Sequence, residues 1–159
     1  MKSAITYFSY SGNTKNVAGV LFAYLSEKGE TRMIELQALD ESGGFLGQCM
    51  RAFRRVRARL NPAELDLSAY ELVCFGTPVW AFGPAPAMNT YLDNCTGVAG
   101  KKVILFTTHG SGIGNQRCLH YMQDILVKKG ARDFSRFSVP QFRVRDKEFL
   151  LSEIKKLSL

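Results

Sequence analysis

Hydroxyl-bearing residues cluster near the start of the chain, between an apolar segment and a helical pattern. Ser9, Ser11 and Thr14 supply the hydroxyls, and Gly12 lets the backbone bend so that its N–H groups converge. Such N–H groups, added to the positive end of the following helix dipole, bind a phosphate without a cationic side chain. A Walker-type loop for a nucleoside triphosphate needs Gly-Lys-Ser/Thr, which this segment lacks. The segment therefore predicts another kind of phosphate site, and an ordinary capped strand-to-helix turn is the alternative.

These residues resemble the flavodoxin family. The phosphate loop of that family reads Ser/Thr-x-Ser/Thr-Gly-x-Thr directly after the first strand, and this chain matches it at every position with Ser9, Tyr10, Ser11, Gly12, Asn13 and Thr14. The resemblance implies that the loop holds the terminal phosphate of flavin mononucleotide (FMN). It also implies a flavodoxin-like fold over essentially the whole chain.

A long apolar loop follows an expected strand at 70–76, and it looks like the ring-binding loop of flavodoxin-family proteins. A flavin ring is flat and apolar with polar edges, so it requires aromatic walls and backbone hydrogen bonds. Trp80, Phe82 or Tyr10 would supply the wall. Gly83 would permit a peptide orientation closed to other residues, so that a backbone group of residues 81–83 faces the flavin N5. The alternative is that Trp80 packs in the core or against a partner. The predicted ring-binding residues are Pro78, Val79, Trp80, Ala81, Phe82 and Gly83.

A glycine-rich segment after the expected strand at 102–108 is the third candidate. Its Gly-x-Gly-x-Gly spacing misses the dinucleotide fingerprint Gly-x-Gly-x-x-Gly, and it follows a late strand. The family resemblance implies that this loop holds the pyrimidine edge of the flavin through backbone N–H groups. Two roles fit His109: a positive charge facing the reduced, anionic flavin, or a locally hydrogen-bonded side chain. His120, on the next helix, is interpreted as structural. The predicted contacts are Thr108, His109, Gly110, Ser111 and Gly112.

The elements expected around these loops alternate between strands and helices. Short β-branched and aromatic runs predict strands at 4–8, 31–36, 70–76, 102–108 and within 133–139. Apolar residues at helical spacing predict helices from 13 to about 28, over 85–94, after the third loop, and within 146–157. The fold class is therefore α/β. Right-handed crossovers give a flavodoxin-like, doubly wound five-stranded parallel sheet in the order 2-1-3-4-5 with helices on both faces. A single domain, 1–159, of the short-chain type is expected.

Positive charge is concentrated in one segment of a chain whose net charge is +7. An apolar stripe predicts an amphipathic helix over 44–60, and its other face carries Arg51, Arg54, Arg55, Arg57 and Arg59. Three interpretations stay open: a docking face for an acidic redox partner, recognition of the extra phosphate of NADPH, and a solvated polar face. Nucleic acid is disfavoured because no aromatic residues are interleaved for base stacking.

The remaining composition restricts where the protein acts. No apolar run is long enough to cross a membrane, and the chain begins directly with a strand, so a cytoplasmic location without a signal peptide is expected. Cys49, Cys74, Cys95 and Cys118 form no Cys-x-x-Cys pair, so no metal site is predicted and reduced, mostly buried thiols are expected.

An FMN-binding electron-transfer protein that shuttles electrons between redox partners is the favoured function, and an NAD(P)H-dependent FMN or quinone reductase of the same fold is the alternative. No catalytic side chain is expected in either case, because the flavin carries the redox chemistry. A flavodoxin-like module without flavin is disfavoured by the intact phosphate loop. The three loops carry no Asp or Glu, whereas carrier flavodoxins are typically acidic, so we expect a less negative potential for the second electron.

Overall fold

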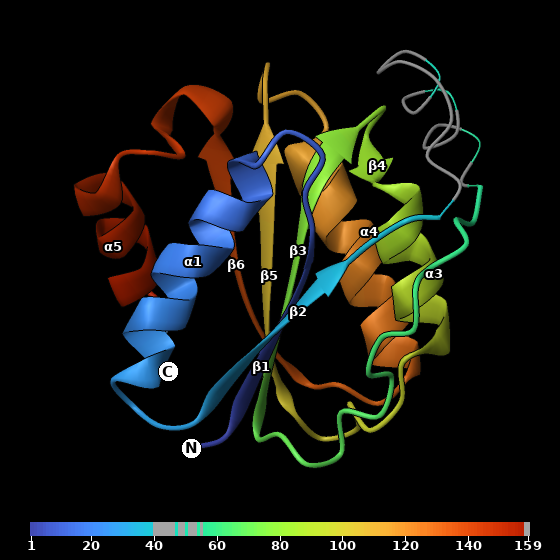
Figure 1. The fold of residues 1–159 in the computed structure, drawn as a ribbon, viewed down its shortest axis with the longest axis vertical. Helices are drawn as coiled ribbons and strands as arrows, with labels where there is room; N and C mark the ends of the chain where they lie inside the picture. Colours follow the sequence, from blue (N-terminus) through green and yellow to red (C-terminus); the bar gives the residue numbers. More distant parts are fainter. Residues whose placement is uncertain (40–46, 48–49, 51–53, 55, 158–159) are drawn as a thin grey trace.

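Five parallel strands form the centre of the computed structural model, which describes residues 1–39, 47, 50, 54 and 56–157 (Figure 1). They lie in the order β2-β1-β3-β5-β6, which confirms the predicted order of five parallel strands. A sixth strand, β4, is only two residues long and pairs antiparallel with the end of β3. The strands are β1 (Ser3–Phe8), β2 (Thr31–Leu36), β3 (Leu72–Trp80), β4 (Gly83–Pro84), β5 (Lys102–His109) and β6 (Asp133–Pro140).

The central strands are apolar along most of their length because helices cover both faces of the sheet. Every residue of β1 is buried, and so are the first six residues of β3 and the middle six of β5. The edge strand β2 instead mixes exposed and buried positions. This contrast places the parallel core at β1, β3 and β5, whose carboxyl ends lie together at the top of Figure 1.

Within the described residues, two helices pack on each face of the sheet, as Figure 1 shows for their arrangement. One pair packs together over an apolar cluster that includes Val17, Leu21 and Leu150, and the other pair covers a second cluster that includes Met88 and Leu119. A short 3₁₀ helix, η1 (Gln141–Arg143), follows β6. The first pair is α1 (Asn13–Ser26) and α5 (Lys147–Lys155), and the second pair is α3 (Pro86–Asn94) and α4 (Asn115–Lys128).

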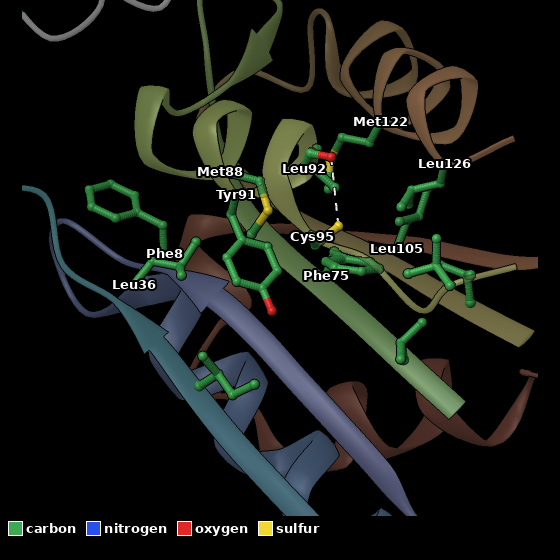
Figure 2. Packing of buried hydrophobic residues seen from close by; sticks show 14 of the residues in the cluster. Phe8, Leu36, Phe75, Met88, Tyr91, Leu92, Cys95, Leu105, Met122 and Leu126 are labelled. Atoms are coloured by element: carbon green, nitrogen blue, oxygen red, sulfur yellow. Dashed lines mark hydrogen bonds between the residues drawn. The ribbon is translucent and has the colours of Figure 1, made fainter. Parts of the chain in front are cut away.

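Large side chains from α3 and α4 fill the space above the sheet (Figure 2). Tyr91 is fully buried, its ring lies 6.2 Å from that of Phe75, and its hydroxyl donates to the backbone oxygen of Glu64 at 2.6 Å. A buried phenol needs such a partner, because an unpaired hydroxyl in an apolar core costs about 1–3 kcal/mol. This layer fixes α3 and thereby the loop that precedes it.

The ring of Phe106 packs directly against the backbone of Gly76, at the start of the second loop. A Cβ at Gly76 would lie only 2.0 Å from Cζ of Phe106 on the neighbouring strand β5. Phe106 in turn stacks on Phe137 of β6 with ring centroids 5.5 Å apart. The glycine at the start of the predicted ring-binding loop therefore admits an aromatic ring on the sheet face.

The helix predicted over 44–60 falls largely outside the described residues, and its final part is wrong. Residues 56–60 are not helical. Leu60 instead forms an antiparallel bridge with Ala38, and the N–H of Leu39 donates to the oxygen of Arg59 at 2.7 Å. The backbone groups of this segment pair with the chain after β2, so the apolar spacing there reflects extended chain rather than a helix. Arg51 and Arg55 lie outside the described residues.

Three of the four cysteines are described, and all three are buried free thiols, as predicted: Cys74, Cys95 and Cys118. Burial raises the pKa of each thiol, to about 11 for Cys95. Cys49 lies outside the described residues. Across the part of the chain that the structure describes, no helix has the length and apolar character needed to span a bilayer.

Candidate functional site

The three predicted loops meet around one cavity of about 540 Å³. It lies at the carboxyl ends of β1, β3 and β5, beside the point where the strand order reverses, which is where open α/β sheets bind ligands. The volume lies within the range of about 300–1,000 Å³ that is usual for small-molecule sites. The lining residues are Ser9, Tyr10, Ser11, Asn13, Thr14, Pro78, Val79, Trp80, Thr108, His109, Gly110 and Gln141.

Most of the residues that sequence reasoning selected line this cavity, and they come from all three loops. Those that do not line it are glycines or residues at the outer turns of the second and third loops: Gly12, Ala81, Phe82, Gly83, Ser111 and Gly112. Sequence reasoning missed Gln141, which lies just after β6. It reaches the cavity because β6 neighbours β5 and Pro140 pairs with His109, a register that local sequence pattern does not state.

The phosphate loop leaves the start of α1 open. Gly12 has a φ of 84° at the N-cap position and has no side chain to cap the helix. The N–H of Asn16 donates to the Gly12 oxygen at 3.0 Å, and the N–H of Lys15 donates to Ser9 Oγ at 3.2 Å. Asn13 and Thr14, the first two residues of α1, line the cavity, so the positive end of the helix dipole lies at the cavity wall and favours an anion.

The lysine of the loop is engaged elsewhere. Lys15 Nζ lies 2.9 Å and 3.2 Å from the two carboxylate oxygens of Glu35 on β2. Tyr7, on the neighbouring strand β1, has its pKa raised by burial and further by the charge of Glu35. The carboxylate thus draws the ammonium group toward β2, so that backbone N–H groups and hydroxyls remain the main recognition groups for a phosphate.

Aromatic side chains form the wall between the first and second loops. Trp80 is only 4% exposed, and its ring meets Phe8 and Tyr10 edge to face at 5.7 Å and 5.6 Å. Tyr10 is 44% exposed. Trp80 therefore lines the cavity while packing in the core, and Tyr10 offers the larger accessible aromatic surface of the two.

The turn between β3 and β4 corrects the expectation about Gly83. The positive φ angles belong to Ala81 (45°) and Phe82 (67°), whereas Gly83 does not have one. A two-residue hairpin loop favours positive φ at both central residues, because this matches the twist of the strands. Phe82 also packs on Gly114 at the start of α4, where a Cβ would lie 2.5 Å from its ring.

The third loop places a neutral histidine at the cavity. Burial lowers the pKa of His109 from its ordinary value of 6.5, which favours the uncharged imidazole over the positive charge considered from sequence. Its Nδ1 atom is buried and has no hydrogen-bond partner among the described residues. Because Nδ1 has almost no accessible surface, it lies within the cavity wall, and a ligand would contact the accessible side of the His109 ring instead. His120 differs, since its Nδ1 contacts the Gln116 oxygen at 2.8 Å.

This arrangement of sheet, helices and carboxyl-end cavity defines a flavodoxin-like α/β protein. A family profile described as NADPH-dependent FMN reductase matches residues 7–143, so the chain belongs to that family. The ligand that defines the family is FMN, which confirms the cofactor predicted from the sequence. None of the curated proteins with which the chain was compared matches it significantly.

Solved structures share the fold at low sequence identity. A flavoprotein from Lactobacillus acidophilus NCFM, in complex with FMN, has a TM-score of 0.66 and 20% identity over 92% of this chain and 98% of that one. Oxidised flavodoxin 2 from Bacillus cereus has a TM-score of 0.61 and 20% identity over 99% and 100% of the two chains. An apo NADH:FMN oxidoreductase has a TM-score of 0.62 and 17% identity over 99% and 91%. At these identities the likeness shows the fold alone.

The residues around the cavity fit FMN on their own chemistry. The uncapped start of α1 and the hydroxyls beside it suit the phosphate. Tyr10 and Trp80 suit one side of a flat ring, and His109 lines the cavity where the polar edge of the ring is expected. Among the described residues, none that lines the cavity is acidic, so none of them places a fixed negative charge against the phosphate.

Proposed function

We propose that the protein is an NAD(P)H-dependent flavin reductase that holds FMN in the 540 Å³ cavity and passes electrons to a small acceptor. The observation that carries this proposal is the extent of the family match. The matched residues, 7–143, include every residue that lines the cavity, from Ser9 to Gln141. The family assignment thus covers the whole site rather than one motif.

The residues of the chain bind and orient, and FMN, when bound, supplies the hydride- and electron-transfer chemistry. The N–H groups at the start of α1, with the Ser11 hydroxyl, hold the phosphate, while Ser9 Oγ keeps the loop closed by accepting from Lys15. Tyr10 covers one side of the ring, and Trp80 supports Tyr10 from the core. His109 lines the cavity from the third loop and contacts the polar edge of the ring with its accessible side.

Charge at the site supports reduction of the flavin. Among the described residues no carboxylate lines the cavity, and negative charge near the ring would disfavour its reduced, anionic form. A less negative potential for the second electron therefore stays our prediction, and a spectroelectrochemical titration measures it. A value as low as in strongly acidic flavodoxins would contradict it.

Electron carriage between proteins is the second candidate, and the likeness in fold to the Bacillus cereus flavodoxin favours it. In that case an acidic redox partner would dock on the basic segment that contains Arg54, Arg57 and Arg59. Arg57 is ion-paired with Asp93, which reduces the charge this segment presents. A cytoplasmic location and such a partner stay predictions.

Anaerobic reduction separates the two candidates. The FMN-loaded protein is mixed with NADPH without oxygen, and the visible absorption of oxidised flavin is followed against free FMN with NADPH. Rapid bleaching, faster than in the protein-free control, is the expected result. A sample that stays yellow until a separate reductase protein is added would contradict the reductase and support the carrier.

A further inference from the structure

A second hollow lies beside the phosphate end of the large cavity. It is a groove of about 340 Å³ between α1 and the segment that leads into α5, which are neighbours on one face of the sheet (Figure 1). It is lined by Asn16, Val20, Val144, Arg145, Lys147 and Leu150. None of these residues lines the large cavity, so the groove is a separate site.

The groove combines an apolar floor with a cationic rim. Val20 is half-buried and offers accessible apolar surface, with the buried Val144 and Leu150 packed beneath it, whereas Asn16, Arg145 and Lys147 are exposed. A flat, weakly polar base packs well on aliphatic side chains, and an arginine beside a lysine attracts phosphate. The lining therefore suits a ligand that carries both an apolar ring and a phosphate.

The carboxylates near the groove do not cancel this charge. Asp146 lies between the two cationic residues in sequence, but its Oδ2 accepts from Arg143 at 2.7 Å and its Oδ1 accepts from the N–H of Phe149 at 2.9 Å. Glu148 is exposed in the first turn of α5 and does not line the groove. Arg145 and Lys147 thus present their charges at the rim.

Both walls of the groove continue from the large cavity. Asn13 lines the cavity and Asn16 lines the groove, and three residues advance a helix by only about 4.5 Å. On the other wall, Gln141 lines the cavity and Val144 lines the groove. A molecule lying over the large cavity reaches the groove by passing the first turn of α1.

We propose that this groove binds the adenosine-phosphate part of the dinucleotide substrate, with the base on Val20 and the aliphatic stems of Arg145 and Lys147, and the phosphate at the charged ends of Arg145 and Lys147. The choice of ligand rests on the proposed NAD(P)H-dependent function. This site replaces the arginine segment 51–59 as the place where the extra phosphate of NADPH is recognised. An adenosine that carries a ribose phosphate therefore binds more tightly than adenosine alone.

Calorimetric titration of the FMN-saturated protein with adenosine 2′,5′-bisphosphate tests the proposal without any redox reaction. Saturating FMN keeps the probe out of the phosphate loop. We expect one-site binding, weakened at least about tenfold by the double change Arg145→Glu with Lys147→Glu, because two charge-assisted contacts are lost. Lys128→Glu with Lys155→Glu changes two exposed residues outside the groove by the same total charge, and this control leaves the affinity within about twofold.

The outcomes distinguish this site from the reductase function. No binding of the probe, or equal weakening by Lys128→Glu with Lys155→Glu, would overturn the groove even if NADPH bleaches the flavin. Equally tight binding of inorganic phosphate would also overturn it, since the apolar floor would then contribute nothing. A third outcome is that the probe binds in a way that depends on Arg145 and Lys147, but NADPH does not bleach the flavin. This would support the groove and contradict the reductase function. If both hold, the double variant raises the KM for NADPH and leaves kcat nearly unchanged.

Discussion

Thr14 and Thr108 join their side-chain oxygens at 2.9 Å in the buried wall of the cavity, although 94 residues separate them in the chain. Thr14 belongs to the first turn of α1, and Thr108 lies near the end of β5. The bond therefore ties the phosphate loop to the loop expected at the pyrimidine edge of the flavin. Both threonines line the same cavity, so this one hydrogen bond is expected to affect both the packing of the fold and the binding of the cofactor.

Replacing either threonine by valine tests this contact. Thr14→Val keeps the shape but leaves the Thr108 hydroxyl unpaired, which costs about 1–3 kcal/mol of the free energy of unfolding and weakens FMN binding. The double change to valine costs less than the sum of the two single changes, because it leaves no hydroxyl orphaned. Urea unfolding and fluorescence titration of FMN measure both effects.

A second hydroxyl pair provides the control. Ser3 and Thr31 also lie 2.9 Å apart, at the opposite end of β1 and away from the cavity. Thr31→Val is expected to lower stability without changing the affinity for FMN. If Thr14→Val changes the affinity no more than Thr31→Val does, the bond serves only the fold.

Loss of the Lys15 ammonium is expected to have little effect on FMN binding. Its Nζ is paired with Glu35, and exposed pairs of this kind contribute only about 0–1 kcal/mol. Lys15→Met should therefore change the dissociation constant less than about threefold. Gly12→Ala is the comparison, because a Cβ strains its φ of 84° and disturbs the backbone N–H groups, so its affinity falls further. A tenfold loss in Lys15→Met would show that the lysine contacts the phosphate directly.

The strained turn between β3 and β4 offers a stabilising substitution. Ala81 has a φ of 45°, a left-handed conformation that costs a non-glycine residue about 1–2 kcal/mol. Asparagine tolerates this conformation better, so Ala81→Asn should raise the free energy of unfolding by about 0.5–1 kcal/mol. The same change at the exposed Ala23 of α1 should lower it, because asparagine is a weaker helix former. Chemical denaturation of both variants checks the opposite signs.

Local patterns predicted the parts of the site that are continuous in sequence. The hydroxyl-rich run from Ser9 to Thr14 links β1 to the first turn of α1 as expected, and the parallel strand order follows from crossover handedness. These features depend on residues that are close together in the chain, so residue type and spacing are enough to indicate their conformation.

Features that depend on distant partners were not predictable in the same way. Positive φ fell on Ala81 and Phe82 rather than Gly83, because hairpin twist outweighed residue preference. Leu60 pairs with Ala38, and this long-range bridge replaces the helix that apolar spacing had indicated at residues 56–60. Gln141 reaches the cavity only because β6 lies beside β5.

The stability of the FMN-free protein should depend on pH through His109. Burial lowers the pKa of this histidine in the folded protein below its ordinary value of 6.5, so the unfolded chain binds the proton more readily. The stabilisation is therefore fully present above the pKa of the unfolded chain. It is lost as the pH falls from that value through the lower pKa of the folded protein. Urea unfolding at about pH 7.5 and 5.5 should show a smaller loss for His109→Gln than for the native chain. His120→Gln, which alters the other histidine, should keep the native loss, and an unchanged loss in His109→Gln would contradict this assignment.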